Sequence, residues 1–169
     1  MFQKDTNISI LGDGGWGTTL AILLADQGFE VSLWGAFPEY VKEVQKKREN
    51  VKFLPGFKIP EQVYLTSDIH EACQEADILV LAAPSQFMRG LARKIKNNKV
   101  HHKLFVTVAK GVETKTLKVM SQVIHEELGK ISLSVLSGPT IARELALKMP
   151  AAASVASTNR EVSSRIRKV

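Results

Sequence analysis

A cluster of glycines near the start of the chain has the spacing of a phosphate-binding turn. The segment Gly12-Asp13-Gly14-Gly15-Trp16-Gly17 follows the apolar run Ile8 to Leu11 and precedes the helix-like stretch Thr18 to Ala25. A G-x-G-x-x-G that closes a strand and opens a helix is the fingerprint of dinucleotide binding. The free N–H groups and the positive dipole end of such a helix favour phosphate oxygens. The pattern predicts a nucleotide site, and the alternative is a glycine-rich turn without a ligand.

Each glycine of this fingerprint has its own expected task. Gly12 permits the tight turn, and Gly14 lets the backbone approach a pyrophosphate without an intervening Cβ. Gly17 lets the helix pack closely on the strand.

Small and polar residues also follow three later apolar runs. Pro84-Ser85-Gln86, Lys110-Gly111 and Ser137-Gly138-Pro139-Thr140 each come just past a predicted strand. Ligands of open α/β sheets bind outside the carboxyl ends of the strands, so these loops are expected to converge on one site. Turn and N-cap preferences explain Gly, Ser and Thr in such loops, but they do not explain the lysine.

Lys110 is expected to project over the edge of the sheet towards a bound dinucleotide. Its ammonium group has three donors and suits a phosphate, a carboxylate or a developing alkoxide. Thr140 has two interpretations that are compatible with each other. One is that it caps a helix that begins near Ile141, and the other is that it offers its hydroxyl to a ligand beside Gly138.

Strand-like and helix-like segments alternate along the whole chain, which predicts an α/β fold with a Rossmann-like, doubly wound and mainly parallel sheet. The expected strands are Ile8 to Leu11, Val31 to Trp34, Val63 to Thr66, Ile78 to Ala82, Leu104 to Val108, Leu133 to Leu136 and Ala151 to Ala156. The expected helices are Thr18 to Asp26, Glu39 to Lys47, Ile69 to Glu75, Gln86 to Lys96 and Thr116 to Leu128.

The composition is that of a globular domain in the cytoplasm. The 169 residues are 44% hydrophobic and 24% charged, and no apolar run approaches the roughly 20 residues of a membrane span. Met1 to Asn7 is polar rather than signal-like. Cys73 is the one cysteine, has no metal-ligand spacing around it, and is expected to face the sheet from a helix. We therefore predict no membrane span and no metal site.

A net charge of +6 raises the question of a nucleic-acid partner. No aromatic residues are interleaved for base stacking, so we predict no nucleic-acid partner and interpret the basic stretch as a solvated helix face with the loop after it. The stretch contains Arg89, Arg93, Lys94, Lys96, Lys99 and Lys103.

Six segments, in this order and spacing, resemble the nicotinamide-dependent sn-glycerol-3-phosphate dehydrogenases over nearly the whole chain. They are GDGGWGTTLA, LWG, FLPG, APSQF, AKGVET and SGPTIARE. The resemblance implies an oxidoreductase that reversibly reduces dihydroxyacetone phosphate to sn-glycerol 3-phosphate, a precursor of glycerophospholipids. AKGVE and SGPT-x-A-x-E carry this resemblance more specifically than the glycines do, because many dehydrogenases share the latter.

The resemblance also implies roles for individual residues. Gly15 and Trp16 would contact the cofactor pyrophosphate, Ala142 the cofactor, Lys110 both cofactor and substrate, and Gly138 and Thr140 the substrate. Phe87 matches an aromatic residue near the nicotinamide in some members, and a place in the core is its alternative.

Two departures from the usual patterns leave the cofactor open between NAD and NADP. Residues Leu33-Trp34-Gly35-Ala36 contain no acidic group at the expected end of the second strand, where Asp or Glu usually holds the ribose of NAD. Bacterial-type relatives often have Arg or His where Ala36 stands, and the absence of this basic residue removes a partner for the phosphate of NADP.

A further departure lies in the glycine-rich segment. Asp13 takes the place of a small neutral residue and would repel a pyrophosphate unless its side chain points away.

The end of the sequence predicts the start of another helix. Asn159 is a candidate N-cap, and Val162, Ile166 and Val169 recur at helical spacing. We expect a dinucleotide-binding domain over 1–158, with 159–169 leading towards a helical domain that carries the general acid–base lysine and lies beyond Val169. By this interpretation the chain alone binds cofactor but is inactive, and a homodimer is one state open to the complete protein. The alternative function is a non-catalytic, dinucleotide-sensing Rossmann module.

Overall fold

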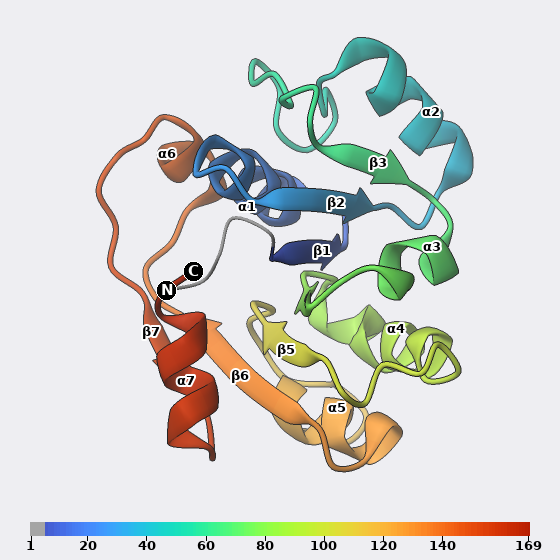
Figure 1. Ribbon diagram of the computed structural model, residues 1–169, viewed down its shortest axis with the longest axis vertical. Helices are drawn as coiled ribbons and strands as arrows, with labels where there is room; N and C mark the ends of the chain where they lie inside the picture. Colours follow the sequence, from blue (N-terminus) through green and yellow to red (C-terminus); the bar gives the residue numbers. More distant parts are fainter. Residues whose placement is uncertain (1–5) are drawn as a thin grey trace.

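Seven strands form a single sheet in the order β3-β2-β1-β4-β5-β6-β7 (Figure 1). The computed structural model describes residues 6–169, so Met1 to Asp5 of the polar start lie outside the described residues. The first six strands are parallel, and β7 is antiparallel to β6. The strands are β1 (Asn7–Leu11), β2 (Glu30–Trp34), β3 (Tyr64–Thr66), β4 (Ile78–Leu81), β5 (Leu104–Thr107), β6 (Ser132–Ser137) and β7 (Ser154–Ala156).

The order of the first six strands is the one of the dinucleotide-binding doubly wound fold, which confirms the predicted fold class. Connections from β1 run outwards to β2 and β3, and the chain then returns to place β4 on the other side of β1. The crevice above β1 and β4 is therefore the point where the strand order reverses, which is where ligands bind in such sheets.

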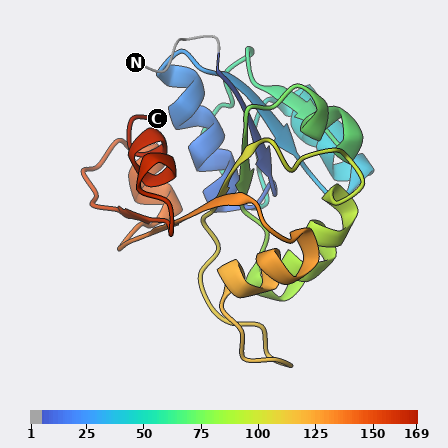
Figure 2. The same ribbon diagram turned by 60° about the horizontal axis from the view of Figure 1, so that its bottom comes forward.

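Helices cover both faces of the sheet (Figures 1 and 2). Alternating side chains of the strands supply two separate cores, because successive residues of a strand point to opposite faces. Ile78 and Val80 of β4 pack in the core under α1 and α7, whereas Leu79 and Leu81 pack in the core under α3, α4 and α5. The helices are α1 (Gly15–Asp26), α2 (Pro38–Lys47), α3 (Ile69–Gln74), α4 (Ser85–Ile95), α5 (Met120–Leu128), α6 (Ala142–Ala146) and α7 (Arg160–Ile166).

Two local predictions are confirmed. Cys73 is fully buried in the second core, on α3, as expected of a small helix residue that faces the sheet. The side chain of Asn159 accepts hydrogen bonds from the N–H groups of Glu161 and Val162, which makes it the N-cap of α7.

The predicted start of the fifth helix at Thr116 is wrong. Leu117 has a left-handed backbone with φ of 57°, and the strand-like bridge between Val112 and Val119 closes a tight loop before α5 begins at Met120. Within it, Glu113 N–H donates to the Lys118 carbonyl. This loop between β5 and α5 projects from the body of the domain (Figure 2).

The interpretation of the basic stretch as a solvated face is wrong for two of its six residues. Lys103 is buried, and its ammonium group donates to the carbonyls of Gln74 and Ala76. Arg89 is half-buried and forms a bidentate ion pair with Glu113, with both N···O distances at 2.8 Å. It also pairs with Glu126 and Glu127 of α5. Arg89 therefore ties the loop after β5 to α4 and α5.

In the part of the chain from residue 6 to residue 169, no helix has the length and hydropathy of a membrane-spanning segment.

The ion pair between Arg89 and Glu113 predicts a pH-dependent contribution to stability. Hydrogen bonds from Arg89 and Thr116 hold the pKa of the Glu113 carboxyl at about 2, below its ordinary value of about 4.3. A carboxyl whose pKa is lowered by folding stabilises the protein fully above that ordinary value, and this contribution is lost as the pH falls towards the folded-state pKa. We expect Glu113→Gln to lower the urea midpoint at pH 7.

The difference in midpoint between the parent chain and Glu113→Gln should shrink steadily from pH 5 towards pH 2. Glu39→Gln is the control, because Glu39 pairs with Lys42 on an exposed helix surface and such pairs contribute little. A difference that stays constant over this pH range would mean that Glu113 acts by packing and not by its charge.

Candidate functional site

A cavity of about 540 Å³ lies at the carboxyl ends of β1, β2 and β4. It occupies the crevice that the strand order predicts for a ligand. Its walls are mostly apolar and include three exposed or half-exposed aromatic rings. The lining residues are Gly12, Asp13, Gly14, Trp34, Ala36, Phe37, Phe53, Ala82, Ala83, Pro84, Phe87, Gly90, Leu91 and Lys94.

The three fingerprint glycines differ in what surrounds them. Gly12 has φ of 135°, and a Cβ there would lie 2.8 Å from the carbonyl carbon of Ala82. A Cβ on Gly17 would overlap the carbonyl oxygen of Gly12, so only glycine lets α1 approach β1 this closely. A Cβ on Gly14 would meet nothing within 4 Å. Gly14 therefore borders open space at the N-terminus of α1, and the cradle, the helix end and the cavity fit a dinucleotide.

Asn50 holds the glycine-rich turn in place, and its role was not predicted from the sequence. This buried side chain donates to the carbonyl of Asp13 at 2.7 Å and to the hydroxyl of Thr18 at 2.8 Å. In turn it accepts from Tyr40 at 2.6 Å and from Phe53 N–H at 3.1 Å. The sequence signal for this role was the irregular stretch around FLPG, because Asn50 and Asp13 lie 37 residues apart in the sequence.

Gly15 and Trp16 begin α1 and Ala142 begins α6, and none of the three is among the residues that line the cavity. A Cβ on Gly15 would come within 2.7 Å of the Phe53 carbonyl oxygen and 3.8 Å of the Ala142 Cβ. Trp16 packs against the core on the α1 face. The Thr19 hydroxyl donates to the Ala142 carbonyl at 3.1 Å, so α6 is fixed against α1.

The structure brings together the three residues predicted to line the substrate site. The Lys110 ammonium group donates to the Gly138 carbonyl at 2.8 Å, to the Thr140 hydroxyl at 3.3 Å and to the Thr140 carbonyl at 3.4 Å. Lys110 is exposed and comes three residues after β5, and the other two residues follow β6. A cation is thus held at the carboxyl ends of two neighbouring strands.

Two alternatives from the sequence are excluded by this geometry. Thr140 does not cap α6, because Ile141 is the N-cap residue and no side chain caps that end. Phe87 is not in the core, because 69% of it is exposed and its side chain lines the cavity.

The end of the cavity near β2 has flat apolar walls with two charged groups. Trp34 ends β2, and its indole N–H donates to the Ser67 carbonyl at 3.0 Å, which fixes the ring. Phe37 is exposed beside it. The Lys94 ammonium group lies 5.9 Å from the centre of the Trp34 ring, and Asp13 approaches from the glycine-rich turn. Flat apolar walls with a few polar groups are typical of sites for aromatic ligands.

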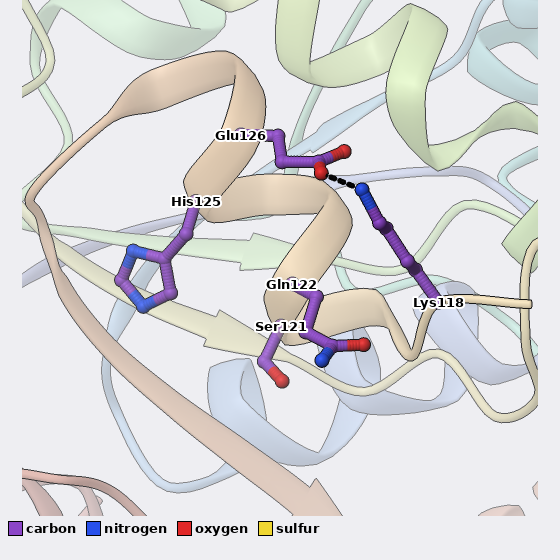
Figure 3. Close-up of a pocket in the computed structure, with 5 residues that line it drawn as sticks. All are labelled: Lys118, Ser121, Gln122, His125 and Glu126. Carbon is purple, nitrogen blue, oxygen red and sulfur yellow. Dashed lines mark hydrogen bonds and ion pairs between the residues drawn. The ribbon is translucent and has the colours of Figure 1, made fainter. Parts of the chain in front are cut away.

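Another hollow lies on the surface of α5 and the end of the loop before it (Figure 3). Its lining residues are Lys118, Ser121, Gln122, His125 and Glu126, and Lys118 is paired with Glu126. It contains none of the predicted site residues. No cluster of His, Cys, Asp or Glu among residues 6–169 could hold a metal ion.

Comparison with known proteins gives a consistent result. A family model described as the N-terminus of NAD-dependent glycerol-3-phosphate dehydrogenase matches residues 7–163. A relative from Prosthecochloris aestuarii named glycerol-3-phosphate dehydrogenase (NAD(P)+) is 40% identical over 165 residues, which are 96% of this chain and 50% of the relative. One from Syntrophomonas wolfei with the same name is 42% identical over 157 residues, or 91% and 46% of the two chains.

The fold is also found in a solved structure of similar description. The crystal structure of glycerol-3-phosphate dehydrogenase from Coxiella burnetii superimposes with a TM-score of 0.92 at 29% sequence identity, covering 98% of this chain and 51% of that one. The chain thus spans about half the length of the curated relatives it matches.

The contact between Gly17 and the Gly12 carbonyl can be tested by comparing Gly→Ala substitutions at a crowded and an open position, which should change stability in opposite directions. Gly17→Ala should lower the free energy of unfolding by about 1–3 kcal/mol, because its Cβ must displace a backbone carbonyl. Gly90→Ala, inside α4 with nothing within 4 Å of the new Cβ, should raise it by about 0.5–1 kcal/mol through helix propensity. Urea denaturation at pH 7 measures both values, and equal effects would argue against the tight contact.

Proposed function

The chain belongs to the NAD-dependent glycerol-3-phosphate dehydrogenase family, and on that basis we propose that it forms the cofactor-binding part of an enzyme that interconverts dihydroxyacetone phosphate and sn-glycerol 3-phosphate. The cavity that begins at the open cradle of Gly14 is the observation that carries the proposal. It combines a helix N-terminus for phosphate oxygens with apolar walls for aromatic rings.

We assign the pyrophosphate of NAD or NADP to the turn formed by Gly12, Gly14, Gly15, Trp16 and Gly17. Phe87 would lie near the nicotinamide end, and Ala142 would complete the cofactor site from α6. The support is that the glycines and Trp16 lie at the N-terminal end of α1, that Ala142 contacts this helix, and that Phe87 lines the same cavity as Gly14. The cofactor, when bound, supplies or accepts the hydride of the reaction.

We assign substrate contacts to Lys110, Gly138 and Thr140. The Lys110 ammonium group has three donors, and carbonyl and hydroxyl oxygens now occupy them. A phosphate or carbonyl oxygen of the substrate would exchange with these neutral acceptors and gain a charge-assisted hydrogen bond. The role of Lys110 is then to orient the substrate and to stabilise negative charge on its oxygen.

We propose residues 1–158 as the dinucleotide-binding domain, with 159–169 leading towards a helical domain that supplies the general acid–base lysine. The support is that the curated relatives are about twice as long as the stretch they share with this chain. A homodimer of the complete protein, a cytoplasmic location and supply of glycerophospholipid synthesis are part of the same proposal. Their support is the family and the phosphorylated substrate assigned to it.

Cofactor binding is the direct test of the proposed function. Titration with NADH and NADPH should give saturable energy transfer from tryptophan to the dihydronicotinamide, because Trp34 lines the cavity. Gly14→Ala should weaken binding by at least about tenfold, since its Cβ enters the space assigned to the pyrophosphate. The same variant should melt close to the parent, because that Cβ meets nothing within 4 Å. Binding of neither cofactor by the parent chain would contradict the proposal.

The assignment of Lys110 is tested by catalysis. We would join residues 1–163 to the C-terminal half of the Prosthecochloris aestuarii relative and follow NADH oxidation with dihydroxyacetone phosphate. Lys110→Ala should lower turnover by at least about a hundredfold, as expected for loss of a group that stabilises charge on oxygen. Lys115→Ala, in the same projecting loop and also exposed, is the control and should leave turnover unchanged. Near-parent turnover of Lys110→Ala would remove the assignment.

A further inference from the structure

The carboxylate of Asp13 occupies the space that a side chain at the end of β2 would fill. Asp13 belongs to the turn after β1, whereas Gly35 follows the last residue of β2. A Cβ on Gly35 would collide with Asp13 Oδ2 and would come within 2.6 Å of Val41 Cγ2. In the observed arrangement, the absence of a Cβ at Gly35 leaves the space that the Asp13 carboxylate occupies. The Asp13 side chain points towards the end of β2. The carboxylate therefore points away from the space beside Gly14, and it does not repel a pyrophosphate bound there.

One oxygen of this carboxylate is buried without a hydrogen-bond partner in the described part of the chain, and the residue that carries it lines the cavity. Asp13 Oδ2 is buried and has no hydrogen-bond partner among residues 6–169, while Asp13 itself lines the cavity. Burial raises the pKa of Asp13, and its own N–H and the nearby Lys52 oppose that change. A buried carboxylate oxygen without a donor costs free energy. Hydroxyl donors of a ligand in the cavity would hydrogen-bond the carboxylate and stabilise its charge.

A carboxylate at this position is the group that dinucleotide folds use to hold the adenosine ribose. The usual Asp or Glu stands at the end of the second strand and accepts hydrogen bonds from the ribose hydroxyls. Residues 33–36 of this chain contain no acidic group. Asp13 brings a carboxylate to the same strand end from the adjoining loop, next to Trp34 and Phe37 of the cavity wall.

We propose that Asp13 is the residue that selects NAD over NADP, by accepting hydrogen bonds from the ribose hydroxyls and repelling a 2′-phosphate. This inference rests on the proposed function, since it assumes that the cavity holds a nicotinamide dinucleotide. Two like charges within a few ångströms in a partly buried site repel strongly. Lys94 is the cation that lines the same cavity, and its ammonium group lies over the Trp34 ring.

The test is the ratio of the dissociation constants for NADPH and NADH, measured by titration of the chain. The parent chain should bind NADH at least about tenfold more tightly than NADPH, the range expected for losing charge-assisted hydrogen bonds and adding repulsion. Asp13→Asn keeps the shape of the side chain and removes its charge, so the ratio should fall to within about threefold. A merely structural role would weaken both cofactors equally and leave the ratio unchanged.

Asp26→Asn is the matched control. It removes the same charge at the opposite end of α1, where Asp26 pairs with Lys148, and it should leave the ratio unchanged. Tighter binding of NADPH than NADH by the parent would show that Lys94 recruits the phosphate and would overturn the inference. An unchanged ratio in Asp13→Asn would overturn it as well. Binding of neither cofactor by the parent would overturn the proposed function itself, and with it this inference.

Discussion

The contact between Gly17 and the carbonyl of Gly12 is the constraint on which the rest of the site depends. It brings the first turn of α1 against the end of β1, because no side chain separates the two backbones at that point. Other segments are then fixed to this turn from two directions. Asn50 joins the turn to the stretch after α2, and the Thr19 hydroxyl joins α1 to α6. The cradle at Gly14 is consequently held by parts of the chain that are far apart in sequence.

The excess of positive charge is distributed unevenly, and that distribution bears on function. Three carboxylates surround Arg89, and Lys103 is buried against backbone carbonyls. Neither Arg89 nor Lys103 is thus available to bind a polyanion. By contrast, Lys94 and Lys110 form no ion pair among residues 6–169 and both lie at the carboxyl ends of the strands. These two cations favour a small anionic ligand at this edge of the sheet and raise its rate of encounter.

The sheet and the loops at its carboxyl ends could be predicted because they depend on local patterns. Apolar runs of four to six residues fixed the strands, and polar residues just past those runs fixed the loops, including the cluster of Lys110, Gly138 and Thr140. Contacts between distant segments could not be predicted in this way. The amide of Asn50 and the carboxylate of Glu113 find their partners only after the chain has folded. The left-handed Leu117 likewise has no local signal, since leucine rarely adopts positive φ.

Asp13 shows that a motif defined by sequence position can miss a side chain that reaches the same point in space from another loop. The absence of an acidic residue from the end of the second strand suggests a site without a carboxylate, yet the neighbouring loop delivers one to the same point. Gly35 accommodates this carboxylate, because a Cβ at that position would occupy the space where Asp13 Oδ2 lies. The two positions therefore constrain each other across adjacent strands. A dinucleotide site is better compared by the groups that reach the ribose than by the strand from which they come.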